Sequence, residues 1–169
     1  LNVSQSAAGL GTGSVIDGSG AMILVKHKGV DNYTVNVADT DAPIDLTISK
    51  KITDLGNYAG MSITFDGGGT VLLENTQSDF AGSIVVKNST TLRVASAGSL
   101  GAQTASKSLT LESGGTFVTP DNFSFAGQYN MTGIQDVLMD VAADGSWSTN
   151  VFTLTGEGSV LSVDSAAAF

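Results

Sequence analysis

Apolar and polar residues alternate in short runs along most of the chain, and turn-forming residues separate these runs. The pattern is most regular at 83–119, which reads SIVVKNSTTLRVASAGSLGAQTASK and then SLTLESGGTFVT. The two lines align with an offset of 25 residues, so that Ile84 falls on Leu109 and Leu92 falls on Phe117. A period of two predicts β-strands with one buried face. Repetition of the two-strand unit predicts an array of similar units.

The same unit recurs from residue 63 to residue 160, and its second strand begins eight residues after its first. The intervening turns are DGGG, KNST, ESGG, TGIQD and TGEG. Successive units begin 21, 25, 20 and 23 residues apart, so the strand pattern persists while the length of the unit varies. This variation fits coils whose corner loops lengthen while their strands stay aligned. We therefore predict an all-β fold, a right-handed parallel β-helix (a solenoid) of roughly seven coils.

Two ladders of inward-facing residues follow from this alignment. The first contains Ile63, Ile84, Leu109, Tyr129 and Phe152, and the second contains Val71, Leu92, Phe117, Val137 and Val160. No coil can bury its apolar face alone, so each ladder depends on the neighbouring coils.

The first sixty residues fit the repeat less well. Leu1–Gly11 aligns with 92–101, which places Leu1 and Val3 in the second strand of a coil. Val15 and Ile23, eight residues apart, are then expected to mark the two strands of the next coil. Further strands are expected at 32–37 and 44–48, separated by an inserted loop that contains ADTDAP.

The composition favours strands and turns and argues against two classes of partner. Hydrophobic residues make up 41% of the chain and charged residues only 14%, with 21 Gly and no Cys. The net charge is −9, and Arg93 is the only arginine. Such a surface repels nucleic acid, whose binding needs clustered cations, and anionic membranes. The absence of cysteine is compatible with export of an unfolded chain through a periplasm.

The run GTVLLENTQSDFAGSIVVKNSTTLRV at 69–94 resembles the passenger-associated transport repeat of autotransporters, the type V secreted proteins of Gram-negative bacteria. The matching residues are Gly69, Thr70, Val71, Leu72, Leu73, Asn75, Phe80, Gly82, Ile84, Val86, Thr91, Leu92 and Val94. Phe80 stands where the family usually has Tyr, and Thr90 stands where it usually has Gly.

The resemblance implies a β-helical passenger region at the bacterial cell surface, as in adhesins and other virulence factors. Residues 1–169 would form a single β-helix segment, a fragment of a longer passenger domain that a C-terminal barrel anchors in the outer membrane. Its role would be non-enzymatic: a stalk or adhesive scaffold that assists its own export as coils fold one upon another. The expected partners are adjacent coils and the barrel of the same polypeptide. A host-cell surface protein or glycan, or self-association, stays open.

The sequence offers little catalytic chemistry, and we predict no catalytic, cofactor-binding or metal-binding residues. His27, the only histidine, lies between Lys26 and Lys28, as is typical of an exposed strand end. A zinc site is not expected without cysteine or a second histidine. The chain also lacks the G-x-S-x-G motif of a nucleophile elbow.

Acidic residues raise two further possibilities. Calcium could find oxygen ligands in the loop 31–45, although a solvated loop is the simpler interpretation because no D-x-D-x-D-G motif is present. The carboxylates of this loop are Asp31, Asp39, Asp41 and Asp45. Carboxylates one unit apart could flank a sugar. The candidate pairs are Asp45 with Asp66 and Asp121 with Asp144. A carbohydrate-active β-helix enzyme is thus one alternative, and an adhesin exported by two-partner secretion is another.

Five N-x-S/T triplets and two isolated aromatic residues complete the candidates. The triplets begin at Asn2, Asn32, Asn88, Asn122 and Asn130. We interpret them through ladders of Asn and Thr side chains that hydrogen-bond in register. Tyr58 and Trp147 lie in turn-like sequences, where an aromatic ring either packs on a loop or docks a sugar or a protein.

Overall fold

The computed structural model describes residues 1–3, 12–25, 31–54, 60–104, 106–120, 123, 125–132, 136–140, 149–155 and 160–164. These residues form sixteen β-strands and one short 3-10 turn, η1 (Ala97–Leu100). All pairings between the strands are parallel. The protein is therefore all-β, as predicted.

Two large sheets contain most of the strands. The first sheet has the order β1 (Asn2–Val3), β4 (Asn32–Val37), β7 (Ser62–Asp66), β9 (Ser83–Val86), β11 (Ser108–Glu112), β13 (Phe125–Thr132) and β15 (Thr149–Thr155). The second sheet has the order β2 (Ser14–Ile16), β5 (Leu46–Ile48), β8 (Thr70–Leu73), β10 (Thr91–Val94), β12 (Thr116–Thr119), β14 (Asp136–Asp140) and β16 (Val160–Asp164). A third sheet pairs β3 (Met22–Ile23) with β6 (Ile52–Thr53).

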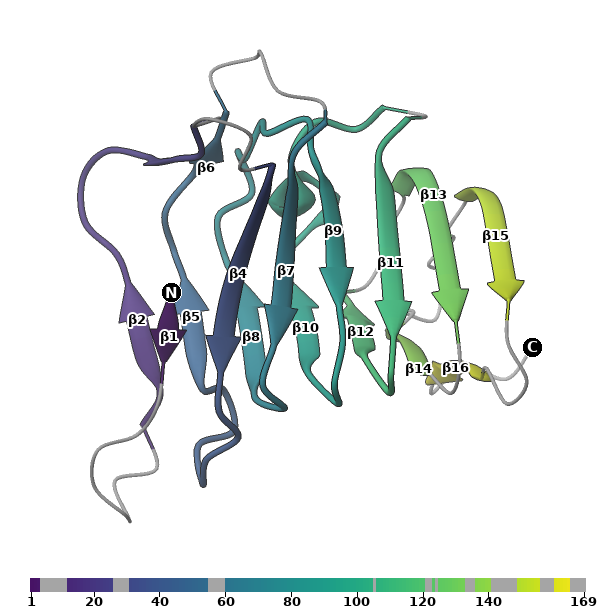
Figure 1. Ribbon diagram of the computed structural model, residues 1–169, viewed down its shortest axis with the longest axis horizontal. Coiled ribbons are helices and arrows are strands. Elements are labelled where there is room, and N and C mark those ends of the chain that lie inside the picture. Colours follow the sequence, from purple (N-terminus) through teal and green to yellow (C-terminus); the bar gives the residue numbers. More distant parts are fainter. Residues whose placement is uncertain are drawn as a thin grey trace.

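The chain visits the first and second sheets alternately, so each pass adds one strand to both (Figure 1). This route has a physical reason. A strand cannot reach a parallel neighbour through a tight hairpin, because the chain must first return to the other end of the sheet. Here the strand in the second sheet makes part of that return. Paired residues on neighbouring strands are consequently 20 (Ser108 and Gln128) to 34 (Asn2 and Asn36) positions apart in sequence.

The strand register of the first predicted ladder is confirmed at every position, and Ile63, Ile84 and Leu109 are buried as predicted. Ile63 pairs with Ile84, Ile84 with Leu109, and Leu109 with Tyr129. Tyr129 in turn pairs with Phe152. The 25-residue repeat is confirmed in the second sheet as well, where Leu92 pairs with Phe117.

The second predicted ladder is wrong at its last position. Val71, Leu92, Phe117 and Val137 are in register, but Val137 pairs with Leu161 and not with Val160. The offset between the two strands of a pass is eight residues from Ile63 to Val71 but nine from Phe152 to Leu161. A single extra residue in a connection moves the following strand by one position and exchanges its two faces.

The predicted assignments near the N-terminus are also wrong. Val3 pairs with Val37 in the first sheet, whereas its alignment with Val94 placed it in the second. Val15 lies in the second sheet opposite Thr47 and is 57% exposed, and Ile23 lies in the third sheet and is 50% exposed. A strand of two or three residues shows too little alternation of apolar and polar side chains to predict which sheet it joins or which of its side chains are buried. In Ser14–Ile16 two adjacent residues are apolar, so either face could have been the buried one.

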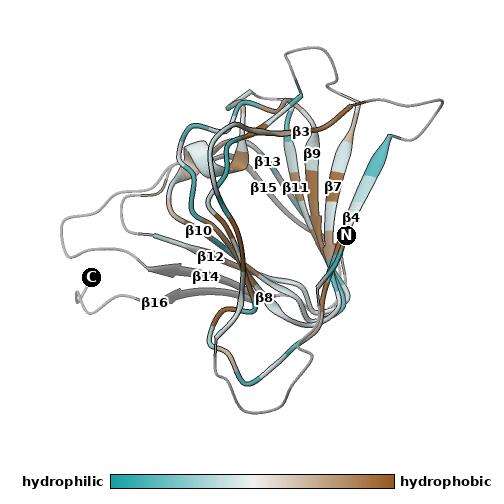
Figure 2. Cartoon of the chain, turned by 90° about the vertical axis from the view of Figure 1, so that its left-hand side faces the viewer, coloured by the Kyte–Doolittle hydropathy of each residue, from teal (hydrophilic) through white to brown (hydrophobic). Residues whose placement is uncertain are grey.

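The core lies between the sheets, on the face that alternate residues of each strand share (Figure 2). Strands β7, β8, β9 and β11 alternate strictly between buried and partly exposed side chains. Val86, Leu92, Leu111 and Phe117 are each 0% exposed. Full burial of an apolar side chain of this size contributes roughly 1.5–3 kcal/mol. The ladders of inward residues are thus the main source of stability.

Val85 and Val86 provide a matched test of this arrangement. Val86 is buried, and Val85 lies next to it on the outer, partly exposed face of β9. We expect Val86→Asp to lower the free energy of unfolding by at least about 3 kcal/mol, because the carboxylate would be buried without a partner. Val85→Asp should cost about 1 kcal/mol or less. Urea unfolding followed by circular dichroism measures both, and equal losses would contradict the assignment of the faces.

Candidate functional site

The inserted acidic loop is anchored to the fold through Asp45. This side chain is only 3% exposed, and its two oxygens accept hydrogen bonds from the backbone N–H groups of Thr40 (2.9 Å) and Thr70 (2.7 Å). The Thr40 hydroxyl donates to it as well. Among the described residues, no group of three or more His, Cys, Asp or Glu side chains is placed to hold a metal ion. Asp45 therefore joins the loop to β8, and it does not converge with Asp31, Asp39 and Asp41 on a metal-ion site.

Asp45 and Asp66, the candidate pair from the sequence, each have hydrogen-bond partners of their own. Asp66 accepts hydrogen bonds from Gly67 N (2.7 Å) and Asn88 Nδ2 (2.8 Å), and its Oδ2 lies 3.5 Å from Lys87 Nζ. Burial alone would raise the pKa of Asp66, but the hydrogen bonds and the charge of Lys87 hold it below its ordinary value. Asp66 is thus a stabilised carboxylate at the turn after β7.

Several candidates from the sequence lie outside the described residues. They are His27, Tyr58, Asp121, Asn122, Asp144 and Trp147.

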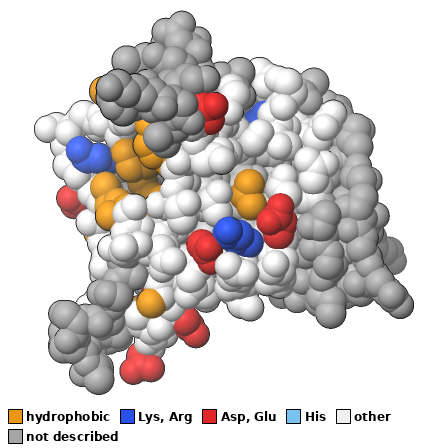
Figure 3. Space-filling view, viewed as in Figure 1, with side chains coloured by type: hydrophobic (Ala, Val, Ile, Leu, Met, Phe, Trp, Pro, Cys, Tyr) orange, Lys and Arg blue, Asp and Glu red, His pale blue; other side chains and the backbone are white. Residues whose placement is uncertain are grey.

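The outer face of the first sheet carries hydrogen bonds between small polar side chains of neighbouring strands, in pairs and not in the predicted ladders of Asn and Thr. Ser62 Oγ donates to Asn32 Oδ1 (2.6 Å), and Ser108 Oγ donates to Ser83 Oγ (2.9 Å). Figure 3 views this face, where neutral polar side chains and backbone predominate and charged side chains are few. The hydrogen bonds run between hydroxyls, or between a hydroxyl and an amide, and so differ from the expected amide ladders. They join successive passes on the solvent side.

The turns between the two sheets share one backbone conformation in three successive passes. Both central residues have positive φ in each turn: Gly67 (105°) and Gly68 (90°), Asn88 (53°) and Ser89 (62°), and Ser113 (53°) and Gly114 (80°). Glycine adopts this conformation without steric cost, and asparagine tolerates it better than most residues. The turns DGGG, KNST and ESGG are therefore equivalent corners, which explains why the strand offset of eight residues is constant there.

The residues that resemble the transport repeat make contacts between passes. A Cβ atom on Gly82 would lie 2.3 Å from the carbonyl oxygen of Met61, and one on Gly69 would lie 2.7 Å from that of Ala38. Asn75 Nδ2 donates to the carbonyl oxygen of Ser49 (3.2 Å). Glycine and asparagine at these positions allow one pass to approach the one before it.

Thr90, at the position where the transport repeat usually has glycine, makes a hydrogen bond to a neighbouring turn. Its side chain is 0% exposed, and Oγ1 accepts from the N–H of Gly68 at 3.0 Å. The departure from the family pattern therefore adds a link between two neighbouring corners.

Lys107 is a buried cation that the sequence interpretation missed. Its side chain is 1% exposed, and Nζ donates to the carbonyl oxygens of Phe80 (3.1 Å) and Gly82 (2.6 Å). The same nitrogen lies 3.7 Å from the centre of the Phe80 ring, a cation–π contact. The 25-residue alignment places Lys107 on the buried Gly82, and this coincidence was the available signal.

Burial lowers the pKa of Lys107 to about 7, and the nearby charge of Asp54 only partly opposes this effect. Asp54 is itself 0% exposed and accepts a hydrogen bond from Ala81 N at 2.8 Å. Lys107 and Asp54 are thus two buried ionisable groups in a largely apolar interior. Such a pair is costly to bury and makes stability depend on pH.

Comparisons of the chain with protein-family models, curated proteins and solved structures find no match. Within the described residues, none of the helical structure is long and apolar enough to span a membrane.

Gly82 and Gly60 test the close approach of successive passes. Gly82→Ala should lower the free energy of unfolding by about 1–3 kcal/mol, because its Cβ would collide with the backbone of Met61. Gly60→Ala is the matched control, since a Cβ there meets nothing within 4 Å. It should be neutral or slightly stabilising. Thermal or urea unfolding of the two variants provides the measurement, and a neutral Gly82→Ala would refute the contact.

Because Lys107 is buried, we expect the free energy of unfolding to rise with pH. An unfolded lysine titrates near 10.4, so between pH 7 and 10 the unfolded chain binds more protons than the folded chain. The free energy of unfolding should increase across this window by at most about 5 kcal/mol, and the contribution of Lys107 should level off about one pH unit below its folded pKa.

Urea unfolding at pH 7, 8, 9 and 10 would measure this dependence. Lys107→Met serves as the control because it keeps the length of the side chain and removes the titrating group. The slope should disappear in this variant. A wild-type profile that is flat between pH 7 and 10, or an unchanged slope in Lys107→Met, would contradict the account.

Proposed function

We propose that the chain is a right-handed parallel β-helix of roughly seven coils and that it forms a non-enzymatic segment of an autotransporter passenger. In this proposal it acts as a stalk or adhesive scaffold on the bacterial cell surface. The observation that carries the proposal is the continuous parallel register of successive passes, from Tyr33 through Ile63 and Ile84 to Phe152. The contacts of Gly69, Asn75 and Gly82, which match the transport repeat, add support.

The arrangement suits export of a chain from one end. In each large sheet a strand pairs only with the strands of the preceding and following passes. A coil that emerges from a membrane can therefore complete its hydrogen bonds on the coil already folded, without waiting for distant parts of the chain. Each added coil buries apolar area, and this gain in free energy opposes backward sliding.

The end of the molecule near β2 and β3 has exposed apolar side chains and unpaired strand edges that suit a partner. Val15, Ile23 and Val25 are at least 50% exposed there, and β2 and β1 are edge strands of their sheets. Exposed edge strands with apolar side chains readily pair with further strands. We assign this end to adjacent coils of the same polypeptide, and a membrane barrel of that polypeptide would anchor the whole to the outer membrane.

An export assay tests the function directly. The chain would be placed between a signal peptide and the membrane barrel of an autotransporter, and surface display would be measured by antibody binding to intact cells. We expect display of the wild-type chain and a loss of about tenfold for Leu92→Asp, whose carboxylate would be buried in the core.

Arg93→Asp is the matched control, since Arg93 is the exposed neighbour of Leu92 on β10. This variant should be displayed as well as the wild type. Equal display of the Leu92→Asp and wild-type chains would contradict a role for coil folding in export.

A further inference from the structure

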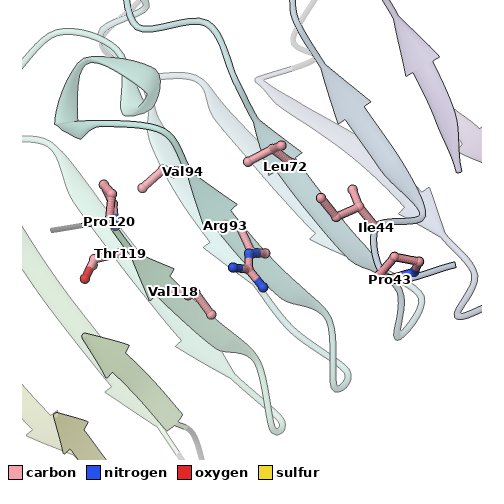
Figure 4. A pocket seen from close by; sticks show the side chains of 8 residues that line it. All are labelled: Pro43, Ile44, Leu72, Arg93, Val94, Val118, Thr119 and Pro120. Atoms are coloured by element: carbon pink, nitrogen blue, oxygen red, sulfur yellow. The ribbon is translucent and has the colours of Figure 1, made fainter. Parts of the chain in front are cut away.

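The outer face of the second sheet contains a groove of about 350 Å³ over strands β8, β10 and β12 (Figure 4). Its volume falls in the range of small-molecule sites. The residues that shape it are Pro43, Ile44, Leu72, Arg93, Val118 and Pro120. They come from the loop before β5, from the three strands, and from the segment directly after β12. The fold thus brings together residues that are nearly 80 positions apart in sequence.

The walls of the groove are apolar where an outer face would ordinarily be polar. Leu72, Arg93 and Val118 are in register on adjacent strands and point away from the core. On the outer face of the first sheet, the equivalent row contains Thr64 and Thr110 on either side of Val85.

Both prolines of the chain, Pro43 and Pro120, line the groove. A proline ring is rigid and apolar and has no N–H donor, so these walls are fixed in place and offer little to a polar ligand.

Arg93 is the only cation among the residues that line the groove. Its side chain is exposed, and no hydrogen bond or ion pair joins it to any residue that the structure describes. The four described lysines are all engaged: Lys50 with Ser19 O, Lys51 with Asp79, Lys87 with Asp66, and Lys107 with two carbonyl oxygens. Among the residues that the structure describes, Arg93 is therefore the cation whose charged group is left to bind a ligand.

We propose that this groove binds a monocarboxylate with an apolar body, of the medium-chain fatty acid type. The guanidinium fork of Arg93 matches a carboxylate with two parallel hydrogen bonds. The side chains of Leu72, Val118 and the prolines cover the hydrocarbon portion. A sugar fits less well because the apolar walls provide few hydrogen-bonding groups, and a polyanion would be repelled by the net negative charge. This inference goes beyond the proposed scaffold function and does not depend on it.

Titration of the purified chain with decanoate tests the proposal, with affinity from calorimetry and location from NMR. Because Arg93 is the only arginine, its Nε–H group gives a single side-chain signal. We expect saturable binding of decanoate that shifts this signal. Arg93→Gln should weaken binding about tenfold or more, since a charge-assisted bidentate contact is lost.

Two controls separate this site from general effects. Lys87→Gln removes the same charge from the turn after β9, where Lys87 pairs with Asp66, and should change affinity for decanoate less than about twofold. Decanol has the same apolar body without the carboxylate and should bind the wild-type chain at least about tenfold more weakly. Circular dichroism confirms that both variants are folded.

Four results would overturn the proposal: no saturable binding of decanoate, binding without a shift of the Arg93 signal, equal losses in Arg93→Gln and Lys87→Gln, or equal affinity for decanol. None of them bears on surface display, so failure here is distinguishable from failure of the scaffold function.

Discussion

Parallel pairing between successive passes is the interaction on which the rest of the structure depends. A parallel neighbour can be reached only after the chain has travelled back, and here it does so through a second sheet that obeys the same rule. The constraint places Ile63, Ile84 and Leu109 in one line and Val71, Leu92 and Phe117 in another. It also requires glycine where two passes approach closely, as at Gly82 beneath Met61.

The same constraint determines where charge can be placed. Within a pass, alternate positions face either the core or solvent, and most charged side chains follow this rule. Asp45, Asp54 and Lys107 do not, and their burial requires hydrogen bonds with backbone groups and, for Lys107, contact with an aromatic ring. Arg93 obeys the rule but lies between apolar walls, and none of the described residues that line this groove is a carboxylate. One cation therefore affects stability through pH, and the other offers a site for a ligand.

The predictions from the sequence were correct where the strands were long enough for alternating apolar and polar residues to show which side chains face the core. The lines through Ile63 and Leu92 followed from period-two runs of four or five residues joined by equivalent turns. The predictions failed at Val3 and Val15, whose strands have two and three residues, and at Val160, where one extra residue shifts the register. The partners of Asp45 and Lys107 depend on contacts between distant passes, and the groove unites residues 43 and 120. A linear pattern does not contain such information.

The most direct test of the central claim is a distance across several passes. Thr34, Thr64, Val85 and Thr110 are in register on adjacent strands, so Thr34 and Thr110 are three strand spacings apart, about 14 Å. The chain has no cysteine, so cysteines introduced at these two outward positions would carry nitroxide labels without interference. Electron paramagnetic resonance should then show a narrow distribution centred near this spacing, allowing for the label arms. A broad distribution, or a mean distance well beyond about 25 Å, would contradict parallel pairing of successive passes.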